Sequence, residues 1–176
     1  LSRMGREPVA AASIGQVHRA VLGAGTPVAV KVQYPKIEGA IRSDFRPAAV
    51  GTKIASVFFP HARVEAFVEE ARARFLEECD YLHEAQAQGE FARLFAGHPV
   101  ITVPAVHLPC CSRRVLTTTF VEGRRLEEYL EDRPSQEERN RLGTALFELY
   151  IGTLFRHGLY NCDPHPGKQV FLPGGR

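Results

Sequence analysis

The chain has 176 residues, of which 44% are apolar and 24% are charged. This composition allows an ordinary hydrophobic core and argues against wholesale disorder. A formal net charge of +2 favours neither a nucleic-acid-binding protein nor a surface strongly attracted to membranes. No apolar run approaches the roughly 18 residues of a membrane span.

The first third of the chain has the pattern of a β-hairpin. Residues 9–21 are small and apolar, and the glycines of residues 23–26 indicate a turn. Residues 28–34 then alternate, with three valines and Tyr34 on one face and Lys31 on the other. Two strands joined by a short glycine turn therefore predict a hairpin that presents Lys31 on its polar face.

The middle and end of the chain are predicted to be mainly helical. Apolar residues recur at helical spacing over residues 64–96, whereas β-branched residues predict a strand over 114–121. Ser135 precedes Glu138 in a capping-box pattern that opens the last helix, and Gly158 ends it. Further helices are expected over residues 36–58, broken near Pro47, and over residues 125–131, with a polar loop at residues 161–167 before residues 170–172.

The order of these elements favours an α+β protein-kinase-like fold. A strand hairpin, a long helix, a strand, a breaker and further helices follow one another as in a kinase N-lobe, hinge and early C-lobe. The order of elements is only a fold-level analogy, and function is indicated by particular residues.

Lys31 is the first candidate functional residue. It lies in Val28-Ala29-Val30-Lys31, which matches the strand motif whose lysine contacts the α- and β-phosphates of ATP. Such an ammonium needs a helix carboxylate to hold it. The alternative is an ordinary solvent-facing strand lysine, because short motifs often match by chance.

Four acids on the predicted long helix are candidate partners for Lys31. Glu78 and Glu84 are six residues apart, which is about 600° of helical rotation, so they do not share one face. At most one acid can point at Lys31, and a solvated acidic face is the alternative for the others. The remaining two are Glu77 and Asp80.

Two loops are further candidates. Residues 10–17 occupy the place of a glycine-rich phosphate loop, and their small side chains allow close approach of a ligand or simply pack well. Asp163 lies in a polar loop where an acid can orient a nucleophile or hold a metal, or form a turn before proline. For His157 and His165 we expect hydrogen-bonding rather than metal-binding roles.

The cysteines indicate no metal site. The chain has Cys79, Cys110, Cys111 and Cys162, with no Cys-x-x-Cys pair and no zinc-like spacing. Reduced thiols in an intracellular compartment are therefore expected.

Four segments together resemble the UbiB/AarF (ADCK) family of atypical kinases. They are Ala-Ala-Ala-Ser-Ile-Gly-Gln-Val-His-Arg-Ala (10–20), Val-Ala-Val-Lys-Val-Gln-Tyr-Pro (28–35), Glu-Cys-Asp-Tyr-Leu-His-Glu-Ala (78–85) and Asp-Pro-His-Pro-Gly (163–167). Their order is that of the family, and the resemblance covers nearly the whole chain.

The resemblance implies a protein-kinase-like fold with an alanine-rich loop, binding of ATP and Mg²⁺, and ATPase or small-molecule kinase activity. It implies support of ubiquinone biosynthesis or of quinone and lipid homeostasis, with a quinone or isoprenoid lipid and biosynthetic proteins as partners and no nucleic acid. The expected location is the cytoplasm, with peripheral attachment to the inner membrane, or the mitochondrion in a eukaryote.

The resemblance also assigns roles to particular residues. Lys31 would contact the phosphates, Glu84 would hold Lys31, and Asp163 would be the catalytic acid. Glu78 and Asp80 would form the regulatory Glu-x-Asp motif. The nucleotide would further contact Ala10, Ala11, Ala12 and Ser13 in the loop, and Thr119, Phe120, Val121 and Glu122 in the adenine hinge.

Three departures from the family pattern qualify these expectations. Lys168 stands where the family has a magnesium-binding Asn, and a lysine would repel the ion. No Asp-Phe-Gly and no Lys-x-Gly-Gln motif occurs, so we expect a chain truncated at both ends, with an N-lobe over 1–118 and a hinge and partial C-lobe over 119–176. The alternatives are a nucleotide- or partner-binding pseudokinase, a true protein kinase, or a chain that never folds stably.

Overall fold

A computed structural model describes residues 3–23, 25–43, 45, 64–161 and 164–172 of the chain. The chain splits into two compact units. The first unit comprises Leu1–Gly89 and Ala105–Phe120, and the second comprises Glu90–Pro104 and Val121–Arg176. The lobe boundary expected between residues 118 and 119 stays a prediction.

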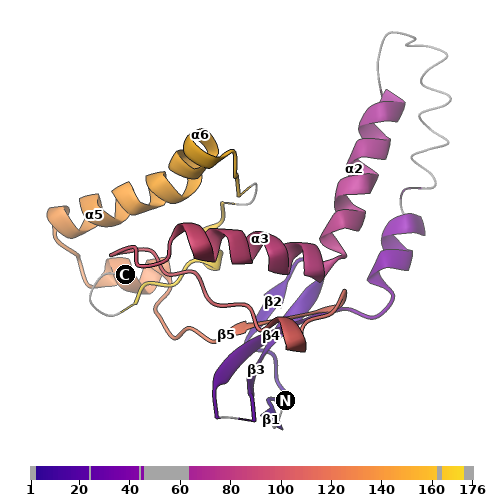
Figure 1. Cartoon of the computed structure of the whole chain (residues 1–176), viewed down its shortest axis with the longest axis horizontal. Coiled ribbons are helices and arrows are strands. Elements are labelled where there is room, and N and C mark those ends of the chain that lie inside the picture. Colours follow the sequence, from indigo (N-terminus) through magenta and orange to yellow (C-terminus); the bar gives the residue numbers. More distant parts are fainter. Residues whose placement is uncertain (1–2, 24, 44, 46–63, 162–163, 173–176) are drawn as a thin grey trace. The chain divides into compact units, whose positions relative to one another are not determined.

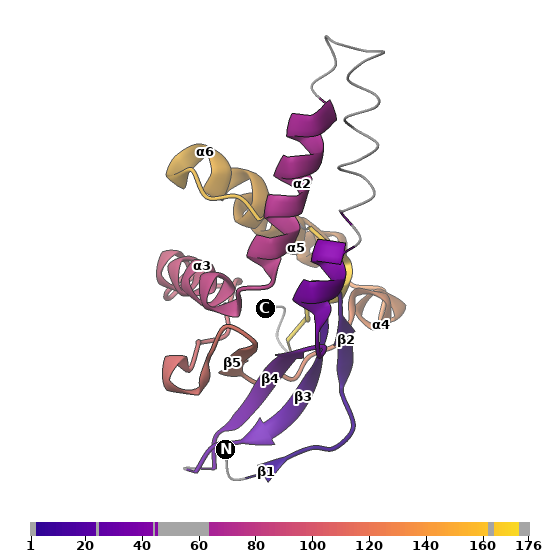
Figure 2. The same ribbon diagram turned by 90° about the vertical axis from the view of Figure 1, so that its right-hand side faces the viewer.

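The first unit is built on an antiparallel sheet (Figures 1 and 2). Its strands run in the order β1-β3-β4-β5, and β2 also pairs with β3. The predicted hairpin is confirmed, since β3 and β4 pair along their whole length. The strands are β1 (Arg3–Met4), β2 (Ala10–Ala12), β3 (Gly15–Val21), β4 (Pro27–Gln33) and β5 (Val115–Thr119).

A tight turn joins β3 to β4. The Leu22 N–H donates to the Thr26 carbonyl at 2.9 Å, and the Gly25 N–H donates to the Leu22 carbonyl at 2.9 Å. Gly25 has a φ of 83°, in the left-handed region that glycine adopts without a steric penalty. The glycine signal in the sequence therefore marks a real conformational requirement.

The predicted alternation of β4 is confirmed. Val28 and Val30 are buried and form one hydrophobic cluster with Ala20. Lys31 and Gln33 belong to the opposite face, because successive side chains of a strand point to opposite sides of the sheet. A second cluster, built around Tyr81, packs on that other side of the unit.

The prediction of a single helix over residues 64–96 is wrong, because this segment forms two helices, α2 (Val64–Glu78) and α3 (Tyr81–Leu94). At the break, the Asp80 carboxylate accepts a hydrogen bond from the Leu82 N–H at 3.0 Å. The Tyr81 N–H donates to the Arg113 carbonyl at 3.0 Å instead of continuing the helix. An acid that caps the following helix in this way competes with the helical ladder.

The break also changes which side chains are buried. Phe67 and Phe75 are among the apolar residues that recur at helical spacing over residues 64–96, yet they are 74% and 48% exposed. Tyr81 does not share that spacing, and it is fully buried. Of the helix expected over residues 36–58, residues 37–43 are helical, and the break expected near Pro47 lies outside the described residues.

The second unit contains the predicted later helices. They are α4 (Leu126–Glu131), α5 (Gln136–Phe147) and α6 (Thr153–His157), with a π-helical segment, Glu148–Gly152, between α5 and α6. The core contains Tyr129, Leu142 and Phe171, and the two aromatic rings stack with centroids 4.7 Å apart. The sequence pattern did not reveal the π-helical segment.

Both predicted helix caps are confirmed. The Ser135 hydroxyl accepts a hydrogen bond from the Glu138 N–H at 3.2 Å at the start of α5. Gly158 has a φ of 66°, and its N–H donates to the Leu154 carbonyl at 3.0 Å at the end of α6. No helix in the described part of the chain is long and apolar enough to cross a membrane.

Candidate nucleotide site

Lys31 lies on β4, an interior strand of the sheet that pairs with β3 on one side and β5 on the other. Its neighbours across the ladder are Val17 on β3 and Leu116 on β5. Glu84 lies in the first turn of α3. The Lys31 ammonium nitrogen is 2.8 Å from one Glu84 carboxylate oxygen and 2.7 Å from the other. Of the acids considered from the sequence, Glu84 is therefore the one that meets Lys31.

Tyr81 lies under the same ammonium. The Lys31 nitrogen is 4.6 Å from the centroid of the Tyr81 ring, a distance at which the ring quadrupole attracts a cation. The Lys31 side chain is 23% exposed and that of Glu84 is 43% exposed. The ammonium is thus held from two sides while part of it still faces solvent.

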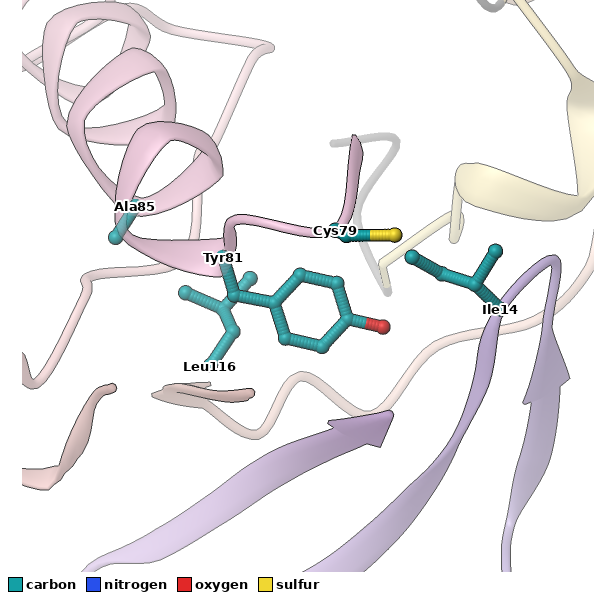
Figure 3. Close-up of a cluster of buried hydrophobic side chains, with 5 residues drawn as sticks. All are labelled: Ile14, Cys79, Tyr81, Ala85 and Leu116. Carbon is teal, nitrogen blue, oxygen red and sulfur yellow. The ribbon is translucent and has the colours of Figure 1, made fainter. Parts of the chain in front are cut away.

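The sequence pattern did not predict a role for Tyr81, although its ring forms the floor of the site. Figure 3 shows its ring in the cluster with Ile14, Cys79, Ala85 and Leu116, with the hydroxyl pointing toward Ile14. The hydroxyl is buried and has no hydrogen-bond partner among the described residues. Burial, and secondarily the nearby Glu84 charge, raises the pKa of Tyr81 well above its ordinary value.

Small side chains share the sheet face of Lys31. Residues directly opposite each other in a ladder point to the same face. Ala10 pairs with Val17, which pairs with Lys31, and Ala12 pairs with Gly15, which pairs with Gln33. Ala10 and Ala12 therefore lie on the Lys31 face.

Other residues near this face differ in their placement. Ala11 lies on the opposite face, because it pairs with Gln16, which pairs with Val32. Ser13 lies in the exposed turn between β2 and β3. Ala29, two residues before Lys31 on β4, shares the Lys31 face and is a further candidate that only strand parity reveals. Contact of these residues with a nucleotide stays a prediction.

The expected hinge residues divide between the units. Thr119 pairs with Val28 and so lies on the face opposite Lys31, and its N–H donates to the Ala105 carbonyl at 2.8 Å. The Phe120 N–H donates to Pro27, and the Arg19 guanidinium lies 4.7 Å from the centroid of the Phe120 ring. Val121 and Glu122 belong to the second unit.

The Glu-x-Asp pair stands at the break between α2 and α3. Asp80 caps α3 and lies 3.4 Å from the Arg113 guanidinium, whereas Glu78 is exposed at the end of α2. The Gln33 amide donates to the Cys79 carbonyl at 2.6 Å and to the Arg113 carbonyl at 3.2 Å. This buried glutamine ties β4 to the turn from which α3 carries Glu84.

Asp163 lies outside the described residues, so its role stays a prediction. In the loop that follows it, residues Pro166–Lys168 form a short 3₁₀ helix. The His165 Nδ1 accepts a hydrogen bond from the Gly167 N–H at 3.0 Å, a hydrogen-bonding role of the kind expected for this histidine.

The described residues include groups whose chemistry suits the phosphates of a nucleotide. The Lys31 ammonium suits phosphate oxygens, and small side chains share its sheet face. Within the described ranges, no three His, Cys, Asp or Glu side chains come together in a way that could hold a metal ion. Lys168 is in the described 3₁₀ helix at the position that the family resemblance gives to a magnesium ligand.

A lysine on an interior strand of an antiparallel sheet, held by a helix glutamate, is the arrangement of a protein-kinase-like N-lobe. The family model of the ABC1 atypical kinase-like domain matches residues 1–172. The chain belongs to this family.

Curated relatives agree with the family. The chain is 32% identical over 165 residues to an AarF domain-containing protein kinase 1 of Xenopus laevis, covering 94% of this chain and 32% of the relative. It is 37% identical over 159 residues to the mitochondrial atypical kinase coq-8 of Caenorhabditis elegans, covering 90% of this chain and 21% of that protein. It is 35% identical to the chloroplastic protein ACTIVITY OF BC1 COMPLEX KINASE 3 of Arabidopsis thaliana, over 99% of this chain and 25% of that protein.

A solved structure shares the fold. It is described as the complex of Rv3197 with erythromycin from Mycobacterium tuberculosis, and it superposes with a TM-score of 0.85 at 36% sequence identity. The match covers 99% of this chain and 44% of the solved one. The chain thus spans less than half of the proteins that it resembles.

Proposed function

We propose that the chain forms the ATP-binding part of an atypical kinase or ATPase. The observation that carries this proposal is the bidentate contact between Lys31 and Glu84, with oxygen distances of 2.8 and 2.7 Å. A lysine that presents its charge to phosphate oxygens in one fixed position has to be held by partners such as these two carboxylate contacts and the aromatic ring below. An ordinary surface lysine has no such requirement.

The geometry suggests how the charge is presented. An ammonium has three N–H donors, and two of the Lys31 donors are directed to the Glu84 carboxylate. The third remains for a phosphate oxygen. Ala10 and Ala12 leave the approach to this donor open, because their side chains are small.

Catalysis would need groups beyond this site. A bound Mg²⁺ would supply charge neutralisation for the transferred phosphoryl group. Asp163 would orient the attacking hydroxyl or water, and Val121 and Glu122 would continue the hinge begun by Thr119 and Phe120. Glu78 and Asp80 would form the regulatory Glu-x-Asp motif at the break between α2 and α3.

We further propose that this protein supports ubiquinone biosynthesis or quinone and isoprenoid-lipid homeostasis. The relatives include a mitochondrial coq-8 kinase and a chloroplastic kinase. In this proposal, biosynthetic proteins are partners and membrane attachment is peripheral, in the cytoplasm or the mitochondrion.

Lys168 favours a second candidate function. A lysine at a magnesium-ligand position would lower affinity for the ion by charge repulsion. The chain would then be a pseudokinase that binds a nucleotide or a partner protein without turnover.

ATP binding and phosphate release test the proposal together. Displacement of a fluorescent ATP analogue from wild type should weaken at least about tenfold in Lys31→Ala, because a charge-assisted phosphate contact is lost. Arg139→Ala, which removes one exposed positive charge from α5, is the control and should bind like wild type. Equal binding by wild type and Lys31→Ala would refute the nucleotide site.

Phosphate release separates the two candidates. Release by wild type without a labelled protein product supports an ATPase or small-molecule kinase and argues against a protein kinase. Binding without release supports the pseudokinase, and Lys168→Asn should then bind Mg²⁺-ATP more tightly. A labelled protein product would contradict both.

A further inference from the structure

A basic concavity lies at the end of β4. It has a volume of about 240 Å³ and is lined by residues between Gln33 and Arg42 together with Arg114. All of these residues belong to the first unit. Neither Lys31 nor Glu84 lines it, so it is distinct from the site described above.

Positive charge dominates the lining. Lys36, Arg42 and Arg114 contribute three cations, and Glu38 contributes one carboxylate. Glu38 lies 2.9 Å from one Arg42 nitrogen. Within the described part of the chain, Lys36 and Arg114 have no ion-pair partner. The concavity therefore keeps a net positive charge after its internal pair has formed.

Neighbouring charges act on the same carboxylate. The hydrogen bond from Arg42 lowers the pKa of Glu38, and the charges of Arg113 and Arg114 add to this effect. Arg113 is directed to Asp80 at 3.4 Å. Arg114 is left as the guanidinium that can serve a ligand in the concavity.

The backbone holds these cations in defined places. The Arg114 carbonyl accepts a hydrogen bond from the Gln33 N–H at 3.1 Å, which ties Arg114 to the end of β4. Lys36 has a φ of 63°, in the left-handed region that residues with a side chain rarely adopt.

We propose that this concavity binds a phosphate group through Lys36, Arg42 and Arg114. A phosphate has several oxygens that accept hydrogen bonds, and here one ammonium and two guanidinium groups come from two segments of the chain, Lys36 and Arg42 from one and Arg114 from the other. The group could belong to a soluble phosphate compound or to a lipid headgroup, and the chemistry of recognition is the same. The proposal goes beyond the nucleotide site and does not depend on it.

Titration of inorganic phosphate into the Lys31→Ala chain tests the proposal, because this background removes the contribution of the nucleotide site. Calorimetry at low ionic strength should show binding that weakens about tenfold in Arg114→Ala, through loss of one charge-assisted contact. Arg139→Ala in the same background should bind like its parent. Glu38→Gln should bind more tightly, because it frees Arg42, and this gain cannot arise from misfolding.

Vesicles distinguish the two sources of phosphate. Phosphatidylcholine vesicles with and without phosphatidate are sedimented with the Lys31→Ala chain and with its Arg114→Ala derivative. Binding of inorganic phosphate alone supports a soluble ligand, whereas Arg114-dependent binding to phosphatidate vesicles supports a headgroup. If neither probe binds, or if Arg114→Ala and Glu38→Gln bind both probes as their parent does, the proposal is overturned.

Discussion

At the scale of single residues, Tyr81 has one favourable and one unfavourable contribution. Its ring makes a cation–π contact with the Lys31 ammonium, whereas its hydroxyl is buried without a hydrogen-bond partner among the described residues. An unsatisfied buried hydroxyl costs about 1–3 kcal/mol. The site therefore gains its aromatic floor at some expense of stability.

Tyr81→Phe should be at least as stable as wild type at pH 8, because the substitution keeps the aromatic ring and removes the buried hydroxyl that lacks a hydrogen-bond partner. Burial raises the pKa of Tyr81 in the folded chain, whereas an unfolded tyrosine ionises near pH 10. The unfolded state then loses its proton first as the pH rises, so wild type loses stability above about pH 10.

Urea denaturation at pH 8 and pH 11 measures this difference. The advantage of Tyr81→Phe over wild type should grow by about 1.4 kcal/mol between the two pH values. Tyr34→Phe is the control, because Tyr34 is 41% exposed. A constant difference between Tyr81→Phe and wild type would contradict the buried, neutral hydroxyl.

Gly15 matters for the space that it leaves. A Cβ at this position would overlap the Val32 carbonyl oxygen and would lie 3.0 Å from the Tyr81 hydroxyl. Gly15→Ala should therefore lower the free energy of unfolding by about 1–3 kcal/mol and weaken ATP binding through Tyr81. Gly23→Ala is matched to it, since a Cβ there would meet nothing within 4 Å. Equal unfolding midpoints for the two variants would show that Gly15 is not required.

At the scale of elements, the helix breaks determine where side chains point. The helical spacing of the sequence continues through Asp80, yet the Asp80 carboxylate caps α3 and separates it from α2. Helical periodicity cannot reveal this, because an aspartate inside a helix and one at an N-cap look alike in a single sequence. The change of phase brings both Tyr81 and Glu84 toward Lys31.

The π-helical segment between α5 and α6 has a local anchor. The Thr153 hydroxyl donates to the Leu149 carbonyl at 2.7 Å, and Thr153 is 2% exposed. Thr153→Val keeps the shape and removes this donor, so it should cost about 1 kcal/mol in urea denaturation. Thr144→Val, on an exposed position of α5, should change stability by less than about 0.5 kcal/mol. Equal losses for the two variants would argue against the anchor.

At the scale of the whole molecule, the sequence predicted more of the fold than of the site. The hairpin, the strand at β5 and the helix caps followed from local signals, namely side-chain alternation, glycine turns and Ser135 before Glu138. The site depends on residues distant in the chain. The facing of Lys31 came from alternation, but its pairing with Glu84 came only through the family resemblance.

The sequence by itself determined the family, through four motifs spread along the chain. It also determined the alternating strand that presents Lys31 and the local start and end of the last helix, because these depend on neighbours within a few residues. Only the tertiary structure decided that Tyr81 lies beneath Lys31 and that Arg114 joins Lys36 and Arg42 around the basic concavity. Register between strands and the break before α3 set these contacts, and both depend on hydrogen bonds between segments that the local pattern does not encode.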